Sequence, residues 1–571
     1  MKKNNWLSIS NNILLFLELV LLAIFVYFHY QIGITRYFDA DEMAHLHWAY
    51  NFYSGLKPYT DFLYFFPPGY LFFLYAFLLF VGKSLTVLVI ARFIAFLVFG
   101  LLLIALFLLV REVRNIRTAF LTILILSFLP LPFDKFLEIR PDNLAVALIF
   151  CGMYFFVRAV KGKKGFFVAG LLYAMSMAVL PKVVFYVLPL IIVLIWRLYF
   201  VGSKKKDYQN LIIGTLIPLI GVLIIFVLFG NFGRAFYLTT NFASLSSKIL
   251  GVKFPMHASR FFYPIDTYYG TNGYNGPLIL NVMIYFLGCF WAVFSLVTFL
   301  NKEKKEESLN EFLLSLSCYL NFYAYIEIFP LKHTQYLIVV APLIAFYFAD
   351  FILKIGSGLE RIKTGKLIYF ICLSSFFILI GFYGIQMNRI KLNWTNKSTM
   401  DNIKILETII PKDEYVLDMV GVAYMYKDPY YICCIPYGQY IEAFRFAVPS
   451  LSDALEKTQT KYVYLQTEGR LSVMTYPDQR YIKEHYITLS HDPIVLIAGV
   501  KIKFEKEEET ADFVSSGNYK IFWNDESYHP ENINVIIDGE RINSDVIFLT
   551  KGKHIISVEA KGQLTIQYQP K

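Results

Sequence analysis

Five side chains suited to acid, base or metal-ligand chemistry lie close together near the start of the chain. They fall within the stretch "FDADEMAHLHWAYNFYSG", residues 38–55, and are Asp39, Asp41, Glu42, His45 and His47. Residues 41–54 have helical character, so Asp41 and His45 share one face at positions i and i+4. One carboxylate suffices to cap the first turn of such a helix. The remaining acids are therefore candidates for function.

A structural alternative stands beside each functional one. Asp39 or Asp41 can cap the helix, and the two histidines can be interfacial polar residues or helpers of a catalytic acid. Together with the histidines, these acids offer ligand types that a metal uses, but their spacing matches no known site. The six cysteines show no metal spacing either, and we expect structural roles for them. No metal site and no required cofactor is predicted, although a divalent cation is compatible with these ligands.

A second group of charges lies in "EIRPDN", residues 138–143. Arg140 between Glu138 and Asp142 can tie the loop down by ion pairs, and Asp142 can cap the apolar run that follows. A cation beside acids at a membrane surface can instead hold a phosphate. Further polar candidates stand at the ends of other apolar runs or in the loops between them: Asp61, Lys182, Arg260 and His333.

The composition indicates a polytopic α-helical membrane protein. Of 571 residues, 57% are hydrophobic and 17% are charged. About eleven membrane spans are expected, at 12–32, 84–110, 117–134, 143–160, 165–181, 183–201, 210–230, 277–300, 308–329, 335–355 and 366–388. The net charge of +10 does not indicate nucleic-acid binding, because the lysines and arginines cluster between apolar runs as the positive-inside rule predicts.

The apolar segment 67–82 is expected to be an interfacial or re-entrant helix, because it is short and begins with two prolines. If it crossed the membrane, the basic clusters at 111–117 and 161–164 would both lie outside. If it lies in the outer interface, every basic cluster becomes cytoplasmic. The outer side then contains residues 33–83, 134–142, 231–276 and 330–334 and all residues after 389.

The chain after residue 390 has the character of water-soluble protein. Residues 400–500 mix a helical start with short strands, and the sequence from 502 alternates at period two with glycine turns. We therefore expect three domains: a transmembrane catalytic domain over 1–390, an extracytoplasmic α/β domain over 391–501 and an extracytoplasmic β-sandwich over 502–571.

The order of these motifs resembles the polyprenyl-phosphate-dependent glycosyltransferases of the GT-C fold, which include protein O-mannosyltransferases and lipid A aminoarabinose transferases. The resemblance covers about residues 10–390. It rests on "DADEMAHLHWAY", "SGLKPYTDF", the "PPGY" that opens a juxtamembrane helix, "EIRPDNLA" and "KHTQY". Relatives often carry an acid and a lysine before the paired prolines, where this chain has Phe65 and Phe66. Asp61 is a candidate substitute for that acid.

The resemblance implies an enzyme that moves a sugar from a polyprenyl-phosphate carrier to a glycan, lipid or protein acceptor, at the outer face of a bacterial plasma membrane. It implies Asp41 as the leading catalytic carboxylate, with Glu42 beside it, and Asp142 and Glu138 as second-site acids. It implies phosphate or lipid-donor contacts from Lys182, Arg140, His333 and Arg260. Secondary roles fall to His45 and Asp61.

The residues themselves suit this chemistry. A lipid-phosphate donor needs no nucleotide, and the chain has neither a glycine-rich phosphate loop nor a dinucleotide motif. A carboxylate can take the proton of an attacking hydroxyl, and a cation can stabilise the leaving phosphate. The aromatic-rich loop 231–276 is expected to close over sugar or lipid, or to form an interfacial aromatic belt.

Two other classes of function remain open from the sequence. A lipid or sugar transporter would want polar groups near the membrane midplane, whereas here most stand at the outer ends of spans. A non-catalytic scaffold or sensor would only display the soluble tail.

Overall fold

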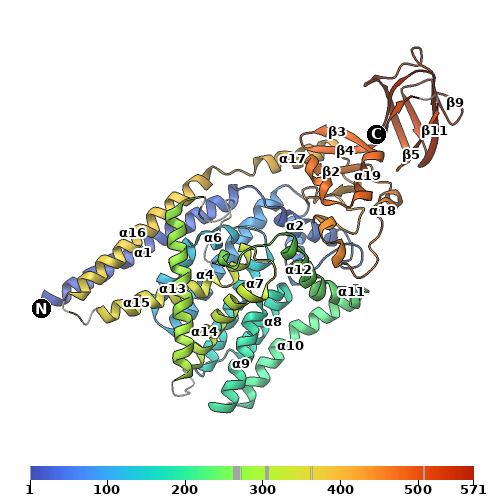
Figure 1. Ribbon diagram of the computed structural model, residues 1–571. Helices are drawn as coiled ribbons and strands as arrows, with labels where there is room; N and C mark the ends of the chain where they lie inside the picture. The colour runs from blue at the N-terminus through green and yellow to red at the C-terminus, as the bar shows by residue number, and fades with distance from the viewer. Residues whose placement is uncertain are drawn as a thin grey trace.

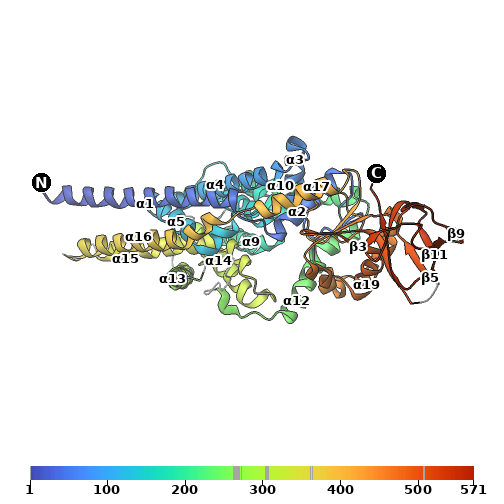
Figure 2. The same ribbon diagram turned by 90° about the horizontal axis from the view of Figure 1, so that it is seen from above.

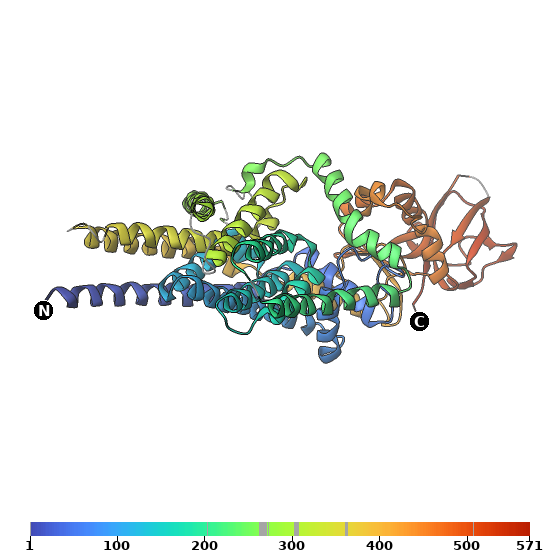
Figure 3. The same cartoon turned by 90° about the horizontal axis from the view of Figure 1, so that it is seen from below.

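The computed structural model describes residues 2–202, 204–261, 271, 273–301, 308–359, 362, 364–505 and 508–570. The centre of the aromatic-rich loop expected at 231–276 lies outside these residues, as do parts of the basic clusters at 203–206, 301–305 and 361–366. Figure 1 shows a helical part that leads into a strand-rich C-terminal part. Seen from below in Figure 3, the strand-rich part lies at the end of the molecule opposite the N-terminus.

A helix occupies each of the expected spans. These helices are α1 (Lys2–Thr35), α4 (Thr86–Val113), α5 (Ile116–Phe128), α7 (Pro141–Val160), α8 (Phe166–Val179), α9 (Val184–Phe200), α10 (Lys205–Leu228), α13 (Asn275–Leu300), α14 (Ser308–Tyr323), α15 (Ala341–Leu359) and α16 (Gly365–Arg389). Among the described residues, eight helical segments are long and apolar enough to cross a bilayer by length and composition. The expected class, a multi-pass α-helical membrane protein with a sheet-rich C-terminal part, is confirmed.

The segment expected to lie in the interface forms α3 (Gly69–Val81), a helix of 13 residues. At about 1.5 Å per residue it is shorter than the roughly 30 Å hydrocarbon core. The chain on both sides of α3 contacts the same soluble segment. The Leu63 amide donates to the Tyr431 carbonyl at 2.6 Å, and the Tyr424 hydroxyl donates to the Ser84 carbonyl at 2.9 Å. The helix therefore begins and ends on one side of the bundle.

The opposite end of the bundle gathers the basic clusters at 111–117 and 161–164. Glu112, near the end of α4, pairs with Lys163, just after α7, at 3.2 Å. Arg114 pairs with Asp350 of α15 at 2.8 Å. Because α4 and α7 both end here, the two basic clusters share one face, as the expected topology requires.

Short helices cover the end of the bundle nearest the strands. They are α2 (Ala40–Tyr53), α6 (Pro130–Lys135), α11 (Phe232–Tyr237), α12 (Ala243–Lys253), and the single turns η1 (Pro181–Val183), η3 (Ala258–Phe261) and η5 (Thr334–Val339). In Figure 2, α1 and α16 run side by side away from the strands, whereas α2 lies beside the strand-rich part. These short elements carry half of the polar residues singled out in the sequence, namely Asp41, Glu42, His45, His47, Lys182 and Arg260.

Among its described residues, the soluble part contains two sheets and three α-helices. The helices are α17 (Lys397–Ile409), α18 (Leu451–Thr458) and α19 (Tyr476–His485). The strands are β1 (Val416–Asp418), β2 (Tyr462–Gln466), β3 (Tyr486–His491), β4 (Ile494–Phe504), β5 (Glu508–Phe513), β6 (Gly517–Trp523), β7 (Glu526–Ser527), β8 (Val535–Ile537), β9 (Glu540–Arg541), β10 (Val546–Leu549), β11 (Gly552–Val558) and β12 (Gly562–Tyr568).

The larger sheet has the order β1-β2-β4-β12-β6-β10, and the smaller one has the order β5-β11-β8-β9. Strand β4 links the two halves of the larger sheet. Its first residues pair with β2 and β3, and its last residues pair with β12. It therefore runs through the boundary expected between residues 501 and 502. The division of the chain at 390 and 501 stays a proposal.

Candidate active site

Helix α2 begins with a reciprocal cap. The Asp39 carboxylate accepts a hydrogen bond of 2.9 Å from the Asp41 amide, and the Glu42 carboxylate accepts one of 2.9 Å from the Asp39 amide. Asp-x-x-Glu is a variant of the capping box, in which the two side chains satisfy free amides of the first turn. Asp39 and Glu42 thus both cap the first turn of α2. The Asp41 carboxylate is left for other contacts.

Glu42 is fully buried and joins three elements. Its carboxylate accepts from Arg92 Nε at 2.8 Å and from Arg92 Nη2 at 2.6 Å, and the Ile139 amide donates to it at 3.0 Å. Both carboxylate oxygens are therefore occupied by α4, by the loop before α7 and by the start of α2 itself. We assign Glu42 a structural role, since no oxygen remains to face a substrate. Arg92 was not singled out in the sequence, although a lone charge within an apolar span is a signal of function or of buried pairing.

Asp41 reaches across to the second acidic motif. Its Oδ2 lies 2.6 Å from Arg140 Nη1, and its side chain is 52% exposed, whereas that of Arg140 is only 5% exposed. Arg140 also lies 3.4 Å from Glu138 and 3.6 Å from Asp142. The two acidic motifs found in the sequence, almost 100 residues apart, thus meet at one guanidinium.

Lys182 extends this group of charges on the far side of Asp142. Its ammonium lies 3.9 Å from Asp142 Oδ1 and 3.5 Å from the centre of the Tyr336 ring. Within the described part of the chain it has no hydrogen bond. An ammonium held by a loose ion pair and an aromatic face keeps its donors available for an anion. Asp142, in the first turn of α7, lies between the two cations.

Glu138 anchors the base of the same group. Its carboxylate accepts from Arg36 at 2.9 Å and from Lys135 at 3.0 Å, in addition to the longer contact with Arg140. Glu138 is fully buried. Like Glu42, it is surrounded by protein donors, and its position fixes the loop that presents Arg140.

The two histidines nearest this group are held neutral by their surroundings. Burial lowers the pKa of His45 to about 4, against the raising effect of Asp41. Burial also lowers the pKa of His333 to about 4, and the nearby charges of Lys135 and Arg140 act in the same direction. His45 packs its ring against Tyr70. At neutral pH neither imidazole carries the positive charge that a phosphate contact would use.

Two crevices flank the charged group. The first lies between α3, α4 and α7, and its walls are almost entirely apolar. Glu138, Arg140 and Asn143 are its polar lining residues. The second is lined by Lys182, Asn321, Tyr325, Phe329, Tyr336, Val339 and Val340. An apolar crevice ending in a guanidinium suits an amphiphile with an anionic head.

Two further residues singled out in the sequence lie away from this group. The Asp61 carboxylate accepts from the Lys57 amide at 2.7 Å and closes a turn on the surface. Arg260 lies in η3, where it contacts the sulfur of Met256 at 3.2 Å. The charge of Arg260 acts electrostatically on Tyr325. Arg260 therefore lies near the second crevice and not at Arg140.

His47 belongs to a different cluster. Its Nε2 lies 2.6 Å from Asp428, and its Nδ1 lies 3.5 Å from Asp418, both in the soluble part. Burial acts to lower the pKa of His47, but the two carboxylates outweigh it and raise the pKa to about 10. His47 therefore faces the soluble part, whereas His45 packs against Tyr70, so the potential ligands noted in the first acidic motif point to different places.

A separate set of potential ligands does come together there. The ligand atoms of His47, Asp428, Cys433 and Cys434 all lie within 4.8 Å of one another. No pattern in the sequence indicates this grouping, because Asp428 lies more than 370 residues after His47. In the structure the two cysteines form a disulfide with each other.

Comparison with known proteins gives a family match over part of the chain. Residues 66–232 match the family model of dolichyl-phosphate-mannose-protein mannosyltransferases. The matched stretch contains "PPGY" and "EIRPDNLA" but neither the first acidic motif nor "KHTQY". No curated protein matches the chain.

Solved structures of glycosyltransferases show a distant similarity. The oligosaccharyltransferase of Archaeoglobus fulgidus, tethered with an acceptor peptide, is 15% identical, with 84% of this chain and 73% of that one covered and a TM-score of 0.49. ArnT from Cupriavidus metallidurans, bound to undecaprenyl phosphate, is 11% identical, with 86% and 98% covered and a TM-score of 0.49. The match of residues 66–232 to the mannosyltransferase family confirms, for that stretch, the resemblance to GT-C glycosyltransferases read from the sequence motifs.

Proposed function

We propose that this chain is a membrane glycosyltransferase that moves a sugar from a polyprenyl-phosphate carrier to an acceptor on the extracytoplasmic face. The observation that carries the proposal is the pairing of half-exposed Asp41 with buried Arg140, which lines an apolar crevice. The family model that residues 66–232 match is named for a lipid-phosphate sugar, and this supports the class of donor.

The donor binds with its tail in the crevice between α3, α4 and α7 and its phosphate near Arg140 and Lys182. A phosphate oxygen is a strong acceptor for guanidinium donors, so it competes with Asp41 for Arg140 Nη1. Binding of the donor therefore frees the Asp41 carboxylate at the moment when a base is needed. Asp142 positions the two cations, and Glu138 holds the loop beneath them.

Transfer then follows as a single displacement. The oxygen of an acceptor hydroxyl forms a bond to the anomeric carbon, and the bond from that carbon to the phosphate oxygen breaks. Asp41 accepts the hydroxyl proton, and polyprenyl phosphate leaves with the bonding electron pair. Arg140 and Lys182 stabilise the charge that develops on the phosphate. The acceptor is a glycan, a lipid or a protein.

The membrane orientation rests on charge. The basic clusters at 111–117 and 161–164 lie at the end of the bundle opposite Asp41, and such clusters stay in the cytoplasm. The active site and the soluble part therefore face the extracytoplasmic side of the cell membrane in this proposal.

A transfer assay tests the function. Purified protein is incubated with polyprenyl-phosphate sugars, and release of carrier phosphate is followed for the wild type and for Asp41→Asn. Loss of the base is expected to lower kcat by about 10²- to 10⁴-fold. The fold should persist, because the Asp41 side chain is 52% exposed and asparagine keeps its shape.

Asp525→Asn serves as the matched control, since Asp525 is an exposed carboxylate that pairs with Lys501 at 3.2 Å far from the site. It should transfer sugar at the wild-type rate. Full activity in Asp41→Asn would remove the assigned base. Absence of sugar transfer by the wild type with every donor would favour the scaffold or transporter class.

A further inference from the structure

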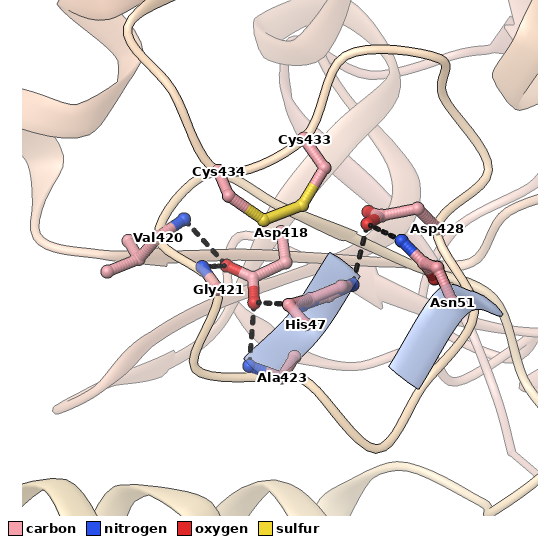
Figure 4. Close-up of a disulfide and its surroundings, with 9 residues drawn as sticks. All are labelled: His47, Asn51, Asp418, Val420, Gly421, Ala423, Asp428, Cys433 and Cys434. Carbon is pink, nitrogen blue, oxygen red and sulfur yellow. Dashed lines mark hydrogen bonds and ion pairs between the residues drawn. A yellow bond between two sulfur atoms is a disulfide. The ribbon is translucent and has the colours of Figure 1, made fainter. Parts of the chain in front are cut away.

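The cluster around His47 joins α2 to the soluble part at a fully buried position. Figure 4 shows His47 and Asn51 on α2 pointing toward Asp418, Asp428 and the disulfide between Cys433 and Cys434. All of these side chains are at most 8% exposed. His47 pairs with Asp418 and Asp428, whereas Arg140 pairs with other acids, so the cluster is distinct from the proposed active site.

The cluster carries more negative than positive charge. Two buried carboxylates, Asp418 and Asp428, face one imidazole, and in the described part of the chain neither pairs with a lysine or an arginine. Asp428 Oδ2 pairs with His47 and accepts a hydrogen bond from Asn51. Its Oδ1 is buried and has no hydrogen-bond partner among the described residues. An unpartnered carboxylate oxygen in the interior is costly unless a cation accompanies it.

Asp418 has the features of a carboxylate that orients a metal-binding histidine. The backbone amides of Val420, Gly421 and Ala423 donate to it at 2.7, 2.9 and 2.6 Å and fix its position. From there it faces His47 Nδ1, which leaves Nε2 directed at Asp428 and the sulfurs. Metal-binding histidines usually donate their second ring N–H to such a carboxylate.

The four remaining ligand atoms suit a tetrahedral ion. Two sulfurs, one imidazole nitrogen and one carboxylate oxygen within 4.8 Å of one another are the donor types and the number that structural zinc takes. The sulfurs are paired in a disulfide, however, and a cysteine sulfur binds zinc only as a free thiolate. The disulfide and the metal therefore exclude each other.

We propose that reduction of the Cys433–Cys434 disulfide opens a zinc site formed by His47 Nε2, the Asp428 carboxylate and the two thiolates, oriented by Asp418. A dithiol supplies two electrons and two protons, becomes a disulfide itself and leaves two protein thiols. Zn²⁺ then displaces the thiol protons and the proton on His47 Nε2. The ion ties α2 to the soluble part in the reduced protein, and the redox state of the two cysteines decides whether the ion binds.

Cobalt uptake by the full-length protein in detergent tests this site. Oxidised and dithiol-reduced protein are compared under anaerobic conditions, with free thiols counted in each sample. Co²⁺ in a two-thiolate tetrahedral site gives a sulfur-to-metal charge-transfer band and strong d–d bands. We expect one Co²⁺ per reduced chain, displaced by Zn²⁺, and none in the oxidised chain.

Variants separate this site from other thiols. His47→Gln and Asp428→Asn should weaken uptake by at least tenfold, and replacing both Cys433 and Cys434 by serine should abolish the charge-transfer band. Cys372→Ser removes an exposed free cysteine elsewhere and should leave uptake unchanged. A disulfide that resists reduction in the folded protein, a reduced protein that takes up no cobalt, or uptake unaffected by His47→Gln would each overturn the proposal.

Discussion

Arg140 has three carboxylates around one guanidinium, and this geometry defines what the residue can do. A guanidinium presents several donors in a fixed plane, so it can face Asp41, Glu138 and Asp142 at the same time. A lysine ammonium is a single point on a flexible stem and cannot reach all three.

Arg140→Lys therefore tests whether the shape of the cation matters as well as its charge. The variant should fold, because the positive charge is kept, but kcat/KM for the donor should fall roughly 10- to 100-fold as one or two charge-assisted contacts are lost. Arg480→Lys is the matched control, because Arg480 is exposed and pairs with a single acid, Glu484, at 2.7 Å. Equal activity of Arg140→Lys and the wild type would contradict the assigned geometry.

The individual charged residues of the proposed site carry a signal in the sequence, whereas their partners do not. Asp41, Arg140, Asp142 and Lys182 stand at the ends of apolar runs, and charge at such places is a signal readable in one sequence. Glu42 carries the same signal, but it is buried, and we assign it a structural role. What separates it from Asp41 is Arg92, 50 residues later, whose side chain reaches it only in the folded bundle.

At the scale of elements, helix α2 connects the two halves of the molecule. Its first turn supplies Asp39, Asp41 and Glu42, and its opposite face carries His47 to the soluble part. The Glu42–Arg92 pair fixes where this helix begins. The position of α2 thus determines how Asp41 contacts Arg140.

Glu42→Gln should therefore destabilise the protein without removing a group that contacts substrate. Breaking a buried ion pair by changing one partner costs about 3–5 kcal/mol, because the remaining charge is left buried and unpaired. Thermal unfolding in detergent measures the loss. The double variant Glu42→Gln, Arg92→Met should recover part of the stability, and a single variant as stable as the wild type would show that the pair does not hold α2.

At the scale of the whole molecule, the sequence predicted the class from composition, and the topology read from charge stays a prediction. Hydropathy marked the spans, and the prolines at 67 and 68 with the short run after them marked α3 as a helix that does not cross. Period-two alternation marked the strands. Which strands share a sheet was not predictable, because β12 pairs with β4 although the strands of the smaller sheet lie between them in the sequence.

That pairing gives a prediction for the proposed boundary at 501. Strand β12 pairs with β4 from Phe504 back to Gly499, so a fragment of residues 502–571 lacks half of its partner strand. The fragment should fail to unfold cooperatively on heating, since β12 would present a bare apolar edge. A fragment of 486–571, which keeps β3 and β4, should unfold cooperatively. Equal thermal midpoints for the two fragments would show that the last 70 residues form a domain of their own.

The central claim is that a lipid phosphate binds beside Arg140 and Lys182 and that Asp41 acts on the acceptor. Equilibrium binding of a sugar-free polyprenyl phosphate to the purified protein tests the first part directly, and it also tests whether the phosphate competes with Asp41 for Arg140. Lys182→Met should bind about 10- to 100-fold more weakly than the wild type, because a charge-assisted contact is lost. Asp41→Asn should bind at least as tightly as the wild type, since removing a negative charge relieves competition for Arg140. Equal affinity for Lys182→Met and the wild type, or weaker binding by Asp41→Asn, would contradict the account.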